Sequence, residues 1–202
     1  MLTLVTPPVT PERQLPVWAE TLRQKYLAGE ASTFILYRNV FDNFLMGGAM
    51  EGLQTFLLDA LLQGSSKQVC EISLERGVRT LRGKEGRTEG NVSTSDIDAL
   101  LPSLHKLEDQ MRSGVATAII VPYADALLPA GDPSFMSNQD RQTYLAFHRM
   151  SLDASLNKGD NITILITESL NAINPALLSN PKVVAIEIPM PDLVLDWKAT
   201  PD

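Results

Sequence analysis

The densest group of charged side chains lies between residues 75 and 94, in the run E-R-G-V-R-T-L-R-G-K-E-G-R-T-E-G-N-V-S-T. This segment carries four glycines, three glutamates and five basic residues, which are Arg76, Arg79, Arg82, Lys84 and Arg87. Basic side chains at this density could hold a phosphate or an acidic partner. The glycines suit a hairpin or a mobile loop, and the glutamates and the position after the second predicted strand make a solvated loop the default interpretation. A basic contact loop is therefore one candidate site.

Other groups that could perform chemistry are few and far apart in the sequence. His105 and His148 are the only histidines and Cys70 is the only cysteine, so no metal-ligand spacing is present. The chain has no G-x-S-x-G motif for a serine nucleophile. Cys70 lies in an apolar run, which predicts a buried, inert thiol, and a single cysteine excludes an internal disulfide. Metal-dependent and serine-hydrolase chemistry are therefore not expected.

The elements that must position any site alternate between strands and helices. Five apolar runs predict strands buried on both faces, at residues 33–37, 68–74, 115–121, 162–167 and 183–188. Amphipathic patterns predict helices at residues 15–28, 53–61, 95–111 and 140–152. Such alternation is typical of a three-layer α/β sandwich with a five-stranded, mainly parallel sheet. We expect residues 15–202 to form this one domain and residues 1–14 to form a flexible N-terminal arm.

The composition and net charge limit the classes of partner that we expect. The chain has 202 residues, a net charge of -7 and a pI near 4.9, which argues against nucleic acid or an anionic membrane as the main partner. No apolar run approaches the roughly 18 residues of a membrane span, and the first 16 residues contain no signal-peptide core. We therefore expect a cytoplasmic protein.

Residues 161–192 carry the most specific pattern. The strand at residues 162–167 ends in Thr167-Glu168, the run N-P-A-L-L at residues 174–178 predicts a short helical turn, and the run I-E-I-P-M-P-D follows at residues 186–192. This succession resembles the large α/β subdomain of AAA-type (AAA+) ATPases. Their sensor-1 strand ends in Thr-Asn and is followed by Asp-Pro-Ala-Leu-Leu and Ile-Glu-Ile-Pro-x-Pro-Asp. The resemblance implies a P-loop NTPase-like topology with the first strand in the centre of the sheet, and a domain without the family's helical lid.

The family's nucleotide motifs do not align in the same way. After the first strand the family has G-x-x-x-x-G-K-[ST], whose backbone N–H groups wrap phosphates. Residues 38–44 here are R-N-V-F-D-N-F, without glycine, lysine or a hydroxyl group. After the third strand, Pro122-Tyr123 stands where the family has its catalytic Asp-Glu pair. Asp125 does align, and it could act as a substitute carboxylate or simply as a helix cap or surface group.

Two further family positions differ. Glu168 replaces the sensor asparagine beside Thr167, and a glutamate there would repel a γ-phosphate. Residues 179–184 contain Lys182 but no arginine finger, and lysine lacks the planar fork of arginine. The family's pore-loop aromatic is also missing between residues 75 and 91. Arg38 and Asn39 could still bind an anion weakly.

These losses predict a degenerate AAA-type domain, a pseudo-ATPase that acts through protein–protein contacts. It would be the N-terminal part or a companion of an AAA-type ATPase, joined by a protein partner or by self-association, with no metal and no cofactor. The alternative is a domain that binds or hydrolyses ATP/Mg at an atypical nucleotide site. In that case Lys84 or Lys182 would have to contact phosphate.

Overall fold

The fold is described from a computed structural model, which covers residues 15–46, 48–83, 86–87, 100–131 and 134–190. The predicted arm at residues 1–14 lies outside the described residues. In chain order the elements are α1 (Val17–Leu27), β1 (Thr33–Arg38), β2 (Asn43–Met46), β3 (Ala49–Gly52), α2 (Leu53–Phe56), the π-helical turn η1 (Leu57–Leu61), β4 (Gln68–Ser73), β5 (Gly77–Gly83), β6 (Gly86–Arg87), α3 (Leu100–Arg112), β7 (Thr117–Val121), α4 (Ala124–Leu127), α5 (Asn138–Leu152), α6 (Ala154–Lys158), β8 (Ile162–Thr167), the 3-10 turn η3 (Leu170–Ala172), α7 (Pro175–Leu178) and β9 (Val183–Ile188).

One sheet organises the domain, with strand order β6-β5-β4-β7-β8-β1-β9. The five predicted strands are β4, β7, β8, β1 and β9, and all their pairings are parallel. β1 lies between β8 and the edge strand β9, so the first strand is inside the sheet, as expected, but beside its edge and not in its centre. β5 and β6 add an antiparallel extension beside β4. The charged segment after β4 is therefore a hairpin over its described part, one of the two forms that its glycines allowed.

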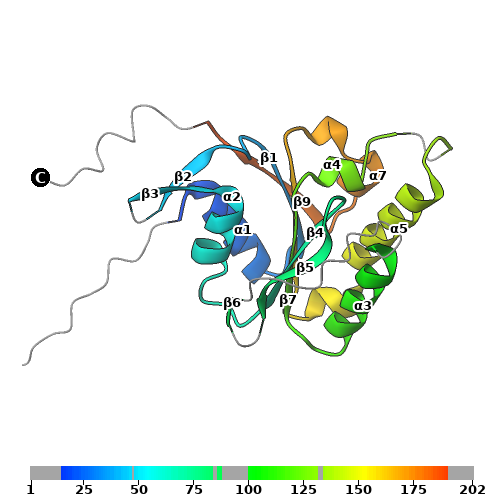
Figure 1. The fold of residues 1–202 in the computed structure, drawn as a ribbon, viewed down its shortest axis with the longest axis horizontal. Coiled ribbons are helices and arrows are strands. Elements are labelled where there is room, and N and C mark those ends of the chain that lie inside the picture. Colours follow the sequence, from blue (N-terminus) through cyan, green and yellow to red (C-terminus); the bar gives the residue numbers. More distant parts are fainter. Residues whose placement is uncertain (1–14, 47, 84–85, 88–99, 132–133, 191–202) are drawn as a thin grey trace, which may run out of the picture.

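Helices cover both faces of the sheet, which gives the predicted three layers (Figure 1). Side chains alternate along β1. Phe34 and Leu36 pack with Trp18 and Leu22 of α1 and with Phe56 of α2. Ile35 points the other way, into a second core with α3, α5, α6 and α7. Because both faces are covered, the parallel strands tolerate unbroken apolar runs.

Local signals explain the short elements near the carboxyl ends of the strands. The Oδ1 atom of Asn174 accepts a hydrogen bond from Ala176 N at 3.0 Å, and Pro175 occupies the first turn of α7. The predicted turn at residues 174–178 is thereby confirmed. Ser137 caps α5 in the same way, through a bond from Asp140 N at 3.1 Å. Its helix begins at Asn138, close to the predicted start at residue 140.

The structure contains elements that the predicted list lacked, including the short helix α4 and the 3-10 turn η3. The expected loop after β1 contains the antiparallel hairpin β2–β3. The short helix α6, capped by Asp153, was not predicted. The predicted helix at residues 95–111 is seen as α3 from Leu100, and its first residues lie outside the described part of the chain.

Candidate functional site

The residues that align with the family's nucleotide site converge at the carboxyl edge of the parallel sheet. Parallel strands end at the same edge, which is where ligands bind in open α/β folds. Arg38 ends β1, Tyr123 follows β7, and Thr167-Glu168 ends β8. Ile188, the last residue of β9, pairs with Arg38. The fold therefore brings the first candidate group together.

The backbone at the end of β1 is engaged by its neighbouring strands. Arg38 N donates to Glu168 O at 3.1 Å and Asn39 N donates to Ile188 O at 3.4 Å. Arg38 has a φ of +81°, a left-handed conformation that is uncommon for a residue with a Cβ. Its guanidinium forms an ion pair with Glu187 of β9. The N–H groups of the last residue of β1 and of the residue after it therefore point to protein carbonyls.

Carboxylates gather beside this ion pair. Thr167 is buried, and its hydroxyl donates to the Oδ1 atom of Asp125 at 3.1 Å and lies 3.2 Å from the carbonyl oxygen of Ser169. Glu168 is exposed. Asp125 and Glu168 therefore add two carboxylates to this edge, where Glu187 already neutralises the guanidinium of Arg38. Asp125 thus ties α4 to β8.

An aromatic pair lies at the same edge. The rings of Phe41 and Tyr123 are stacked, with centroids 5.2 Å apart and planes 29° apart. Both side chains are more than half exposed, at 52% and 59%. Tyr123 has a φ of +52°, so its backbone is held in the sparsely populated left-handed region. Sequence alignment with the family marked position 123 only as a missing carboxylate, and did not find this pair.

A cavity of about 410 Å³ lies next to Tyr123, where β4 and β7 end. Arg76 and Arg79 line it, together with the buried carboxylate of Glu71. The Nη2 atom of Arg79 donates to Glu71 Oε2 at 3.1 Å, and Gln54 of α2 donates to the same oxygen. Arg76 forms a longer ion pair, in which its Nε atom lies 3.7 Å from Glu75 Oε1. The structure therefore places two members of the predicted basic loop beside the aromatic pair.

The remaining basic residues do not join this group. Arg82 turns to the end of η1, where its Nη2 atom donates to Leu62 O at 2.9 Å and to Ser65 Oγ at 3.1 Å. These hydrogen bonds pair with groups at the end of η1 that have no partner within the helix, so Arg82 has a structural role. Arg87 belongs to β6, and its side chain lies outside the described residues, as does all of Lys84.

Several groups at this edge that align with the family's phosphate and magnesium ligands are already bonded within the protein. A phosphate cradle needs free backbone N–H groups after the first strand, whereas those of Arg38 and Asn39 are bonded. The side chain of Val40 is buried in the core, which ties down the next residue. Of the oxygen groups that could bind magnesium, Asp125 and Thr167 are bonded to each other, while Glu168 is exposed.

The sequence matches a family model described as the AAA+ chaperone, N-terminal Rossmann-like domain, over residues 7–189. The chain belongs to this family. The AAA-type resemblance drawn from residues 161–192 is thereby confirmed, and so is the α/β fold class. A search of the curated proteins finds no significant match.

Solved structures share this fold. One chain of the Escherichia coli MS115-1 HORMA:CdnC:Trip13 complex superposes with a TM-score of 0.51 and 16% sequence identity. The match covers 87% of the AAA+ chaperone domain described here and 56% of that chain. The domain thus spans little more than half the length of its solved neighbour. Among the described helices, none combines the length and the apolar character that a membrane span requires.

Proposed function

We propose that this AAA+ chaperone domain is non-catalytic and works through protein contacts at the carboxyl edge of its sheet. Its partner would be an AAA-type ATPase domain, either in the same polypeptide or in a companion subunit. The observation that carries the proposal is the stacked, exposed pair of Phe41 and Tyr123 at the position where the family binds nucleotide. Aromatic side chains with large exposed faces are the commonest anchors of protein interfaces.

The surroundings of the pair support a protein ligand over a nucleotide. The adjoining cavity offers both a positive group, Arg76, and a buried carboxylate, Glu71, so its polarity is mixed. A triphosphate would instead meet the carboxylates of Glu168 and Glu187. Interfaces combine an apolar anchor with polar groups around it, and arginine is enriched among them.

The first experiment titrates the purified chain with ATP and ADP, with and without Mg²⁺, by calorimetry and thermal shift. A ligand at 100 times its dissociation constant adds about 2.7 kcal/mol of stability, so even modest affinity would be visible. We expect no heat and no shift at millimolar nucleotide. Saturable, Mg²⁺-dependent binding would refute the proposal and support the alternative of an atypical ATP site.

In the second experiment, this protein is purified from its native host through an affinity tag. The quantity measured is the amount of an AAA-type ATPase chain with an intact P-loop that is recovered with it. The variant combines Phe41→Ala with Tyr123→Asn, because asparagine tolerates the left-handed backbone at position 123. Loss of two aromatic anchors should lower recovery by about tenfold or more. Phe135→Ala is the matched control, since it removes another aromatic side chain that is 90% exposed. Equal recovery with the double variant and the control would contradict the assigned contact surface.

A further inference from the structure

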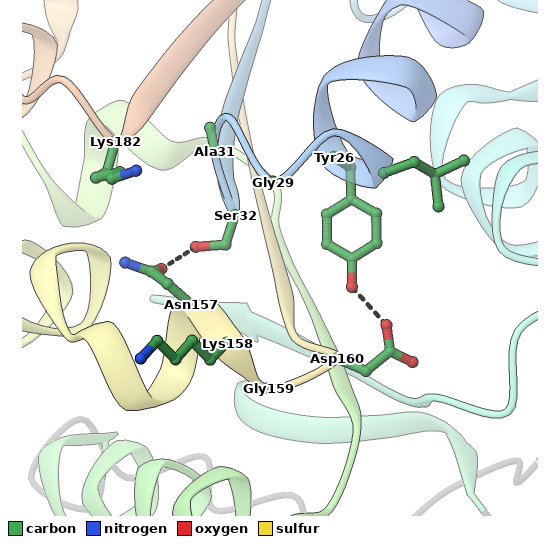
Figure 2. A pocket seen from close by; sticks show the side chains of 10 residues that line it. Tyr26, Gly29, Ala31, Ser32, Asn157, Lys158, Gly159, Asp160 and Lys182 are labelled. Atoms are coloured by element: carbon green, nitrogen blue, oxygen red, sulfur yellow. Dashed lines mark hydrogen bonds between the residues drawn. The ribbon is translucent and has the colours of Figure 1, made fainter.

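A second pocket lies at the opposite, amino edge of the sheet, away from the aromatic pair. It has a volume of about 290 Å³ and is formed where the chain enters β1, β8 and β9. Ser32 precedes β1, Asp160 precedes β8, and Lys182 precedes β9, while Asn157 and Lys158 come from α6. Figure 2 shows these side chains around the pocket, with Tyr26 of α1 on one wall. Of the residues that line it, only Lys182 was singled out from the sequence, as a possible phosphate contact of an atypical nucleotide site.

The pocket carries an excess of positive charge in a chain whose net charge is -7. Lys158 and Lys182 both line it, and neither ε-ammonium has an ion-pair or hydrogen-bond partner among the described residues. The one lining carboxylate, Asp160, is already neutralised by Lys67 and accepts a hydrogen bond from Tyr26 at 2.6 Å. Both lysines are exposed to solvent, so two uncompensated cations line one small, open pocket.

Neutral polar groups complete the lining. The hydroxyl of Ser32 donates to the Oδ1 atom of Asn157, which leaves the hydroxyl oxygen as an acceptor only. The Nδ2 atom of Asn157 donates to Ser151 O at 3.1 Å and keeps one further N–H. In Figure 2 this amide nitrogen and the two lysines lie on the same side of the pocket. The donors are thus gathered on one wall, while Tyr26 and Ala31 give apolar surface elsewhere.

The turn that carries Lys158 and Asp160 is fixed by packing. A Cβ at Gly159 would come within 2.6 Å of the Nδ2 atom of Asn161, so the glycine is needed for the close approach. Asn161 is itself buried and bonded on both sides, to Thr117 N at 3.0 Å and Leu156 O at 3.1 Å. This part of the pocket wall is therefore fixed before any ligand arrives, which lowers the cost of binding.

We propose that this pocket binds a compact phosphate dianion, either inorganic phosphate or a small phosphate monoester. Lysine acts as a point charge for phosphate, and two of them with an amide donor supply charge-assisted hydrogen bonds. The volume is at the lower end of small-molecule sites. It leaves room for a short organic group against Tyr26, and too little for a nucleoside triphosphate. The site is independent of the contact surface at the other edge, so either can fail without the other.

The test is a calorimetric titration of the full chain with inorganic phosphate and, separately, with glycerol 3-phosphate, at fixed ionic strength. The variants are Lys158→Gln and Lys182→Gln, and Lys106→Gln is the control because it removes an exposed lysine of α3 that does not line the pocket. Each pocket variant should weaken binding by about tenfold, the loss expected for one charge-assisted hydrogen bond. The control should bind like the unmodified chain.

The two titrants distinguish the two sources of the dianion. Tighter binding of the monoester assigns the apolar wall to its organic group, and equal binding assigns the site to phosphate itself. Both outcomes support the pocket as a phosphate site. Absence of saturable binding by either titrant would overturn the proposal, and so would equal weakening by all three lysine substitutions, because that would show only general charge attraction.

Discussion

The network of Lys67, Asp160 and Tyr26 allows a quantitative test of how the amino edge of the sheet is held together. Lys67 is only 5% exposed, and it pairs with Asp160 while its Nζ atom lies 5.2 Å from the centre of the Tyr26 ring. These residues come from α1 and from the segments leading into β4 and β8. Asp160→Asn would leave the Lys67 ammonium buried without its counter-charge.

Breaking a fully buried ion pair costs about 3–5 kcal/mol, whereas an exposed pair is worth about 0–1 kcal/mol. The Asp160 side chain is 60% exposed, and the Tyr26 ring still offers a cation–π contact to Lys67 after the substitution. We therefore expect Asp160→Asn to lower the free energy of unfolding by about 2 kcal/mol, between these limits. Urea denaturation at neutral pH measures the loss, and Asp109→Asn, an exposed acid on α3, is the control.

The pH dependence gives an independent check. The hydrogen bond from Lys67, helped by that from Tyr26, holds the pKa of Asp160 below its usual value of 3.8. A carboxylate with a depressed folded-state pKa stabilises fully above the unfolded value and loses that contribution as the pH falls through the folded one. The difference between the two proteins should therefore shrink below pH 3.8. A loss under about 0.5 kcal/mol at neutral pH, the scale of an ordinary surface substitution, would refute the reasoning.

Two further predictions concern other buried polar groups. Burial raises the pKa of Glu108, but hydrogen bonds from Arg112 and Arg149 outweigh it and the net pKa is lowered. Glu108→Gln should cost about 1–2 kcal/mol in urea denaturation, and a neutral result would mean that both arginines are solvated. Burial also raises the pKa of the Cys70 thiol, which is 1% exposed. A thiol reagent should label it only after unfolding, and rapid labelling of the native protein would contradict this.

The sheet was predictable because its strands are buried on both faces. Runs such as residues 162–167 consist only of isoleucine, leucine and β-branched threonine, and all six residues are buried, which favours a strand between turn signals. The hairpin β2–β3 was missed because Ala49–Gly52 has weak strand propensity. The pair Gly47-Gly48 was the available signal, since Gly-Gly favours tight hairpin turns. Gly48 has a φ of +90°, and Met46 pairs with Ala49.

The candidate site was predictable only in part. Alignment with the family motifs located Arg38, Asp125 and Glu168, and the sheet brings them to one edge. The stacking of Phe41 on Tyr123 depends on where the chain turns after β1 and after β7, which no local pattern encodes. The amino-edge pocket was missed for the same reason, because its lysines are distant in sequence and meet only through the parallel pairing of β1 with β8 and β9.

The hydrogen bonds at the carboxyl edge also determine which changes would allow this site to bind a nucleotide. Replacing residues 38–44 with a glycine-rich lysine motif would supply the missing side chains. It would not by itself free the N–H groups of positions 38 and 39, which extend the pairing of β1 with β8 and β9. Nor would it remove the requirement for an apolar group where Val40 packs in the core. The ends of β1, β8 and β9 together keep these N–H groups bonded. Restoring the motif one residue at a time should therefore fail to restore nucleotide binding.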